Sequence, residues 1–291
     1  MKPAPFAYFD PRTVADAVAL LEEHGMDAKV LAGGQSLVPL LNMRLARPAV
    51  LVDINRIDGL DYIRDDGDAI AFGAMTRQRA VERSRLVREK LPLLHEAMTF
   101  IAHPQIRNRG TIGGSLAHAD PAAELPAIAQ VLEAEFVIAG PGGTRTAASK
   151  DFFVTYLTSC LEPNEILTEV RFPLLPPSTG WSFIELSRRH GDFALAGVAA
   201  TLTLSGGSIA DARVGLFGVG ATALRATEAE VLLRGQRPDA AIFEDAGTSA
   251  AAAIDEPLSD IHASAEYRRD LARVLTRRAL AESASRAGAA A

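Results

Sequence analysis

Cysteine is almost absent from this chain of 291 residues, in which Cys160 stands alone. One thiol cannot form an internal disulfide, and it cannot supply the several thiolates that a zinc cage or an iron–sulfur cluster needs. An excess of basic residues is lacking too: the formal net charge is −6. This charge argues against a protein whose main task is to bind nucleic acid or an anionic membrane. Any iron–sulfur centre that works with this chain must lie on another chain.

Long apolar runs are also lacking. No segment approaches the roughly 18 uninterrupted apolar residues of a membrane-spanning helix, and the first residues, Met1–Phe6, contain no apolar signal core. We therefore expect a cytoplasmic protein without a membrane span. The 23 glycines, 16 prolines and 48% hydrophobic residues are ordinary values, which exclude collagen-like and wholly disordered chains and leave room for about two domains.

The pattern of apolar residues predicts an α+β protein. A helical stripe over 14–21 stops at Gly25, and the proline-rich segment 174–180 marks a boundary before an antiparallel meander and C-terminal helices. We expect one domain at 1–175, a second at 180–286 and a frayed tail at 287–291. Strands are expected at 28–32, 49–54, 60–64, 69–72, 135–139, 144–147, 165–172, 181–186, 197–204 and 209–219.

Several charged residues show no pattern of a catalytic or metal site. The histidines His103, His118 and His190 lack the spacing of a helical metal site, so no metal ligand and no catalytic side chain is assigned. Arginines in two helical stretches are expected on solvated faces. They are Arg77, Arg79, Arg83, Arg85 and Arg88 in the first stretch, and Arg268, Arg269, Arg273, Arg277 and Arg278 in the last.

Two glycine turns offer chemistry that the rest of the chain lacks. They are Gly33-Gly34-Gln35-Ser36 and Thr111-Ile112-Gly113-Gly114-Ser115, and we expect each to follow an apolar strand. Paired glycines let a phosphate approach several backbone N–H donors, and hydroxyl groups add further donors. Either turn alone also fits a simple chain reversal with a positive φ. Neither matches G-x-G-x-x-G or a phosphate loop with lysine, which disfavours a Rossmann nicotinamide site and a P-loop nucleotidase.

The residues of these two motifs, in this order, resemble those of a known family. Residues 30–37 (VLAGGQSL) and 111–121 (TIGGSLAHADP) are similar to the flavin-binding medium subunits of molybdenum hydroxylases, such as carbon monoxide and xanthine dehydrogenases. Residues 188–194 (RRHGDFA) resemble the family's R-x-x-G-D-F/Y-A stretch, and the likeness covers nearly the whole chain. It implies a vanillyl-alcohol-oxidase-type (PCMH-type) FAD-binding domain with subdomains at about 1–56 and 57–175. A smaller C-terminal domain of antiparallel sheet plus helices follows.

The resemblance also implies a set of residues that bind FAD without a covalent bond. The two glycine loops face the pyrophosphate, Phe193 lies beside the flavin ring, and Glu124, where the family often has Asp, bonds an FAD hydroxyl. Without the resemblance, Phe193 would be taken as a core residue. Asp192 is either a turn residue or a partner of the flavin edge. The implied cofactor-binding residues are Leu31, Ala32, Gly33, Gly34, Gln35, Ser36, Leu37, Val38, Ile101, Thr111, Ile112, Gly113, Gly114, Ser115, Asp120, Glu124, Leu167, Asp192 and Phe193.

By resemblance, the chain is an FAD-binding electron-transfer subunit. A large partner would bind the molybdenum cofactor and a small partner the iron–sulfur clusters, in a dimer of heterotrimers, and the flavin would pass electrons to an external acceptor. Two alternatives are a stand-alone flavin oxidase of the same fold and a flavin-free assembly or binding module. Eukaryotic xanthine dehydrogenases carry a lysine near the flavin where this chain has Ile184 or Glu185, so reduction of NAD is not implied.

Overall fold

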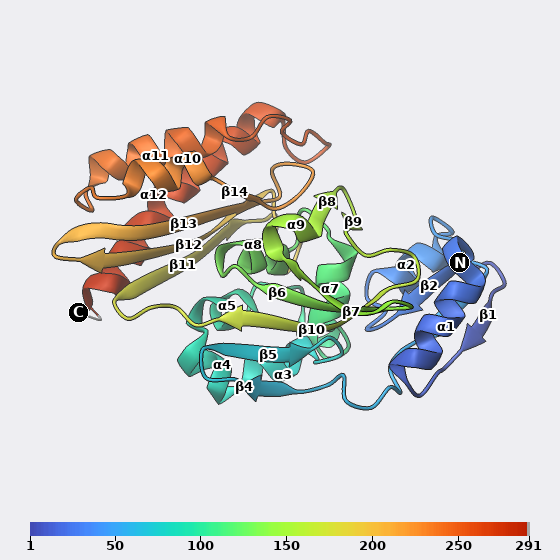
Figure 1. Ribbon diagram of the computed structural model, residues 1–291. Coiled ribbons are helices and arrows are strands. Elements are labelled where there is room, and N and C mark those ends of the chain that lie inside the picture. Colours follow the sequence, from blue (N-terminus) through green and yellow to red (C-terminus); the bar gives the residue numbers. More distant parts are fainter. Residues whose placement is uncertain (290–291) are drawn as a thin grey trace.

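The computed structural model describes residues 1–289. Its first part is a small parallel sheet flanked by helices (Figure 1). Its elements are β1 (Ala7–Phe9), α1 (Val14–His24), η1 (Gly25–Asp27), β2 (Ala28–Leu31), α2 (Leu37–Asn42) and β3 (Val50–Asp53). The strands lie in the order β1-β3-β2, and both pairs are parallel. Helix α1 begins after Thr13, whose hydroxyl accepts a hydrogen bond from the N–H of Asp16 at 3.1 Å, and it ends at Gly25 with φ +51°. The sequence predicted both ends.

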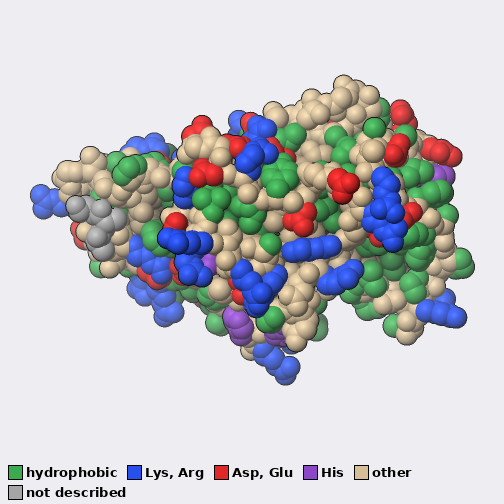
Figure 2. All heavy atoms as spheres, turned by 90° about the horizontal axis from the view of Figure 1, so that it is seen from below, with side chains coloured by type: hydrophobic (Ala, Val, Ile, Leu, Met, Phe, Trp, Pro, Cys, Tyr) green, Lys and Arg blue, Asp and Glu red, His purple; other side chains and the backbone are tan. Residues whose placement is uncertain are grey.

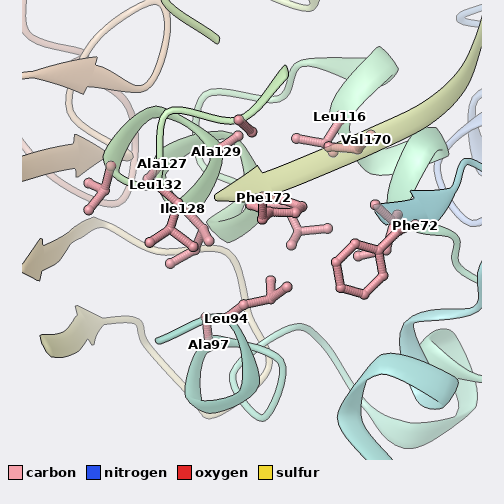
Figure 3. Close-up of a cluster of buried hydrophobic side chains, with 14 of the residues drawn as sticks. Phe72, Leu94, Ala97, Leu116, Ala127, Ile128, Ala129, Leu132, Val170 and Phe172 are labelled. Atoms are coloured by element: carbon pink, nitrogen blue, oxygen red, sulfur yellow. The ribbon is translucent and has the colours of Figure 1, made fainter. Parts of the chain in front are cut away.

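The second part is an antiparallel sheet covered by helices. Its elements are β4 (Ile63–Asp65), β5 (Ala69–Gly73), α3 (Gln78–Arg83), α4 (Arg85–Lys90), α5 (Pro92–Ala97), α6 (Pro104–Arg107), α7 (Ile112–His118), α8 (Glu124–Val131), β6 (Glu135–Gly140), β7 (Gly143–Ala148), α9 (Ser149–Phe152), β8 (Phe153–Thr155), β9 (Thr158–Ser159) and β10 (Ile166–Pro173). The main strands lie in the order β4-β5-β10-β6-β7. Apolar side chains from α5, α7 and α8 pack with those of β5 and β10, where the rings of Phe72 and Phe172 meet edge to face at 5.6 Å (Figure 3).

The third part is an antiparallel meander with three helices on one face. Its elements are β11 (Thr179–Leu186), β12 (Ala196–Ser205), β13 (Ser208–Phe217), β14 (Leu224–Arg225), α10 (Thr227–Leu233), α11 (Ala240–Ala252) and α12 (Ala265–Ala289). Val198 and Ala200 face α12, whereas Phe183 and Phe217 belong to the core of the second part, where α8 packs on β12 and β13. This sheet is therefore covered on both faces, and the chain is α+β as predicted.

The prediction of a frayed tail at 287–291 is wrong for 287–289, the part of this range that the structure describes. Helix α12 continues through residue 289, and Ala287 is fully buried against β11 at Gly180. The preceding residue, Arg286, donates a hydrogen bond to Glu96 at 2.6 Å and covers the ring of Trp181. These contacts hold the last turns of α12 against the second part. A sequence rich in alanine and glycine gives no sign of such contacts. Residues 290 and 291 lie outside the described residues.

Charged side chains of both signs are interspersed on the face seen in Figure 2. Arg83, Arg85 and Arg88 are exposed as expected, and Arg85 pairs with Glu89 at 2.7 Å. Other arginines expected on solvated faces are less exposed. Arg79 and Arg273 are half-buried beside Glu82 and Glu244, Arg77 is half-buried, and Arg268 is only 3% exposed. Arg77 and Arg268 both bind backbone carbonyl groups of distant segments, which helical spacing cannot show. Within residues 1–289, no helix is long and apolar enough to cross a membrane.

Candidate cofactor site

The structure brings the two glycine turns into contact. Gly33 packs on the backbone of Arg109 and Gly110 so closely that a Cβ at Gly33 would overlap the carbonyl oxygen of Arg109. A Cβ at Gly114 would lie 3.4 Å from the Cβ of Ala32. A side chain at Gly33 would therefore push the two turns apart, and this glycine is required by their close approach, whereas a Cβ at Gly114 would only touch Ala32 and would instead overlap Thr111 Oγ1 of its own turn.

The first turn presents backbone donors that nothing else in the described residues uses. Within residues 1–289, the N–H groups of Gly33, Gly34, Gln35 and Ser36 donate no hydrogen bond. Gly34 has φ +72°, the left-handed conformation that in anion-binding loops directs successive N–H groups into one concavity. The Gln35 side chain is held in place because its Nε2 donates to the carbonyl of Gly33 at 2.9 Å. A phosphate group is a ligand that suits such a set of donors.

The second turn differs from its prediction in two respects. It follows helix α6 instead of a strand, and it forms the first turn of α7, with Thr111 as the N-cap. Its N–H groups are already occupied: Gly113 donates to the carbonyl of Ala74 at 2.9 Å, and Gly114 donates to Thr111 Oγ1 at 3.0 Å. This turn can therefore offer a ligand the hydroxyl groups of Thr111 and Ser115 and close access, but few free N–H groups.

A pocket of about 280 Å³ lies beside the first turn. Asn55 braces the turn, because its Nδ2 donates to the carbonyl of Ala32 at 2.8 Å and its Oδ1 accepts from Arg77 at 2.6 Å. Arg77 also donates to the carbonyl of Arg109 at 2.5 Å, and burial, followed by the charge of Arg109, lowers the pKa of Arg77. The pocket is lined by Leu31, Ala32, Gly33, Gly34, Gln35, Val38, Asp53, Asn55 and Arg109.

Three of these supporting residues were missed by sequence reasoning. Asn55 comes two residues after β3, at the end of a parallel strand where ligand-binding side chains often gather, so a signal for it existed. Arg77 and Arg109 carry no such signal, because the bonds of Arg77 to Asn55 and Arg109 form only once the first and second parts of the fold meet.

Two carboxyl groups are buried where the second and third parts meet. Glu124, at the start of α8, is 5% exposed, and burial raises its pKa to about 7. Both carboxylate oxygens of Glu185 on β11 are buried, and no group within residues 1–289 gives them a hydrogen bond. Burial, and then the nearby charge of Glu124, raises the pKa of Glu185 to about 8. A ligand that carries hydroxyl groups would give the carboxyl group of Glu185 the partners that the described residues do not supply.

The loop between β11 and β12 holds the predicted aromatic residue. Phe193 is 62% exposed, so the pattern-based expectation of a core residue is wrong. Asp192 lies in a turn, in which its N–H donates to the carbonyl of Arg189 at 3.0 Å. A Cβ at Gly191 would lie 2.6 Å from Nδ1 of His103, so this loop packs on the segment that leads through α6 to the second glycine turn.

The remaining predicted residues occupy the core or its edge. Ile101 and Leu167 are 6% and 4% exposed and belong to the buried cluster of the second part. Asp120 is half-buried, and its Oδ1 accepts a hydrogen bond from the N–H of Ala122 at 2.9 Å. No group of three or more His, Cys, Asp or Glu side chains in the described part of the chain could hold a metal ion.

Two sequence families match the chain almost from end to end. Residues 4–175 match the FAD binding domain in molybdopterin dehydrogenase, and residues 181–283 match the CO dehydrogenase flavoprotein C-terminal domain. The first match covers both the parallel sheet and the five-stranded sheet, and the second covers the meander and its helices. The unused N–H groups of the first turn, the glycines that permit close approach and the partnerless buried carboxyl group all fit FAD as the ligand.

Known proteins are similar to the chain over its full length. It is 45% identical to the 6-hydroxypseudooxynicotine dehydrogenase complex subunit alpha of Paenarthrobacter nicotinovorans over 99% of this chain and 97% of the relative. A solved structure of carbon monoxide dehydrogenase from Hydrogenophaga pseudoflava matches with a TM-score of 0.96 and 43% identity, over 98% of this chain and 99% of the other. Quinoline 2-oxidoreductase from Pseudomonas putida 86 matches with a TM-score of 0.93 and 36% identity, over 99% of each chain.

These matches confirm the resemblance in the motifs and the predicted fold: a PCMH-type FAD-binding domain is followed by a C-terminal flavoprotein domain. The relatives are subunits of dehydrogenases and hydroxylases, so the chain is an oxidoreductase subunit. The chain belongs to the family of FAD-binding medium subunits of molybdenum hydroxylases, the family of the carbon monoxide dehydrogenase medium chains.

Proposed function

We propose that this chain carries electrons, through a non-covalently bound FAD, from an iron–sulfur partner to an external acceptor. The observation that carries the proposal is the set of unused N–H groups in the first glycine turn, which lies beside a pocket in the matched FAD-binding domain. Bound FAD supplies the capacity to accept electrons singly or in pairs. The protein would position the cofactor, shield it from water and set the charge around it.

The residues divide the work by their chemistry. The N–H groups of residues 33–36 would bind the diphosphate, and the hydroxyls of Thr111 and Ser115 would add donors to it. Glu124 and Glu185 would bond hydroxyl groups of the cofactor, and Phe193 would contact the flavin ring. Ile101 and Leu167 would exclude water. The low exposure of the two carboxyl groups and the high exposure of Phe193 support this division.

The partners follow from what the chain lacks and from its relatives. With one cysteine it cannot hold the clusters that would relay electrons, and the relatives are called medium chains, medium subunits or subunits of complexes. We place the iron–sulfur clusters on a small chain and the molybdenum cofactor on a large chain, in a dimer of heterotrimers. The large chain then selects the substrate. The cytoplasmic location and the domain limits remain predictions from the sequence.

Mixing experiments test this division of labour. The purified chain, loaded with FAD, should be reduced by dithionite but should stay oxidised when mixed with carbon monoxide, nicotine or aldehydes. Addition of the small and large chains should restore reduction of the flavin by the true substrate, measured by the loss of flavin absorbance. Turnover of a small molecule by the isolated chain at about 1–1000 per second would instead establish a stand-alone oxidase. A folded chain that takes up no FAD would establish a flavin-free module.

Phe193→Ala should change the flavin more than it changes the fold. Because the side chain is mostly exposed, its loss should alter the free energy of unfolding by only about 0.5 kcal/mol or less. The flavin absorbance, fluorescence and midpoint potential should shift, since an aromatic face beside the ring is replaced by water. Tyr156→Ala removes another exposed aromatic side chain, at the β8–β9 hairpin, and should leave the flavin unchanged. An unchanged flavin in Phe193→Ala would remove Phe193 from the site.

A further inference from the structure

Arg268 is a buried cation that binds backbone groups at the end of the C-terminal sheet. Its Nη1 donates to the carbonyl of Leu195, and to the carbonyl of Gly218 at 2.6 Å. Its Nη2 donates to the carboxylate of Asp260 at 2.7 Å, and its Nε has no partner within residues 1–289. The guanidinium thus joins helix α12 to Leu195, the residue before β12, and to Gly218, the residue after β13.

The two carbonyl groups belong to segments that border the proposed flavin site. Leu195 comes two residues after Phe193, and its own N–H donates to the carbonyl of Leu186 at 2.8 Å, which closes the loop that carries Phe193. Gly218 has φ +72°, and its N–H donates to the carbonyl of Pro121 at 2.7 Å. Pro121 lies next to Asp120 and before Glu124. Arg268 therefore connects the Phe193 loop with the segment of the FAD-binding domain that carries the buried carboxyl group.

The hydrogen bonds of Arg268 make both loops depend on this one side chain. A buried guanidinium loses its hydration, and the carboxylate of Asp260, whose side chain is 46% exposed, restores only part of that loss. The remaining hydrogen bonds go to the carbonyl groups of Leu195 and Gly218, which would be left without this partner if Arg268 were replaced by an apolar residue. The neighbouring Arg269 is exposed and donates to the carbonyl of Ile254 at 2.7 Å, within its own domain. The arrangement around Arg268 is distinct because it fixes the positions of two loops.

We propose that Arg268 is a positioning residue of the flavin site, which holds the Phe193 loop in register with the 120–124 segment across the domain boundary. This inference rests on the proposed place of Phe193 beside the flavin. Arg268 does not touch the cofactor and acts only through the two carbonyl groups that it binds. Its planar fork can serve Leu195, Gly218 and Asp260 at once, whereas a lysine ammonium lacks this geometry.

Arg268→Lys and Asp260→Asn test the proposal in the FAD-loaded chain. The first variant keeps the charge and loses the fork, and the second keeps Arg268 but removes its counter-charge. Hydrogen exchange measured by mass spectrometry should rise about tenfold or more in peptides covering 190–196 and 217–222 of Arg268→Lys, because charge-assisted hydrogen bonds to both segments weaken. Peptides of α11 should not change. Arg269→Lys is the matched control and should leave all of these peptides as in the wild type.

The flavin gives the second readout. The midpoint potential and absorbance of Arg268→Lys should shift in the same direction as those of Phe193→Ala, and the double variant should shift no further than Phe193→Ala alone. If Phe193→Ala shifts the flavin and neither Arg268→Lys nor Asp260→Asn does, the positioning role is wrong while the flavin site stands. If exchange rises in both segments but Phe193→Ala leaves the flavin unchanged, the proposed place of Phe193 is wrong instead. Additive shifts would also overturn the inference.

Discussion

Replacement of Gly34 by valine should give a folded chain that purifies almost free of FAD. A β-branched residue does not hold the φ of +72° seen here, so the peptide should rotate and carry the N–H groups of Gly34 and Gln35 out of the concavity. Each hydrogen bond to a charged group is worth about 1.5–3 kcal/mol. Loss of two donors should therefore raise the dissociation constant of FAD by at least about a hundredfold. Fluorescence titration of the apoprotein with FAD measures the change.

A matched control, Gly59→Val, separates the loss of FAD binding from the effect of backbone strain at a substituted glycine. Gly59 has φ +81° and open space where a Cβ would lie, so Gly59→Val carries the same backbone penalty away from the turn and should keep its FAD. Gly114→Val is a poorer test, because its Cβ would lie 2.7 Å from Thr111 Oγ1 and disturb the start of α7. If Gly34→Val is folded and binds FAD as tightly as the wild type, the diphosphate does not lie on the first turn.

Glu185→Gln should make the apoprotein less sensitive to alkaline pH. The pKa of Glu185 rises from 4.5 to about 8 on folding, so between these values the folded chain holds a proton that the unfolded chain has released. The free energy of unfolding therefore falls as the pH rises through this window. A neutral amide removes this dependence. Between pH 6 and pH 8 the wild type should lose about 1–2 kcal/mol more than the variant, a value reduced from the full linkage because the side chain is partly exposed.

Urea unfolding of both proteins at a series of pH values measures the difference in slope. Glu124 remains in both proteins, so its own raised pKa adds the same pH dependence to the free energy of unfolding of each protein at first order. Glu22→Gln, which changes an exposed carboxyl group on α1, should follow the wild type at every pH. Parallel curves for the wild type and Glu185→Gln would show that the carboxyl group of Glu185 is ionised or solvated in the folded chain.

Local chemistry allowed much of the fold to be predicted. Thr13 and Gly25 mark the ends of α1 because capping acts between residues close in sequence, and the turn Ser205-Gly206-Gly207 indicates the hairpin of β12 and β13 for the same reason. The second glycine turn was misplaced, because a pair of glycines looks alike in a loop and in the first turn of a helix. Its occupied N–H groups depend on Ala74 and Thr76, which are distant in sequence.

The candidate site was predictable where the motif residues themselves line the pocket, and not where the supporting side chains come from distant segments. Of the predicted residues 31–38, those at 31–35 and Val38 line one pocket. Glu185 and Arg268 were missed, because their burial depends on how the C-terminal sheet meets α8 and α12. Apolar spacing on α12 identifies one face correctly, but it cannot show that Arg268 reaches the end of the sheet.

The sheet that is covered on both faces also affects how the chain is made. Helix α12 follows the meander in the chain, and until it has been made and docks, the faces of β11 and β12 that it covers remain open to water. The first two parts are complete in sequence well before then, but Phe183 and Phe217, which belong to their core, are added late. The sheet is therefore closed only after α12 has been made, and a nascent chain that stalls before α12 exposes strand surface prone to association.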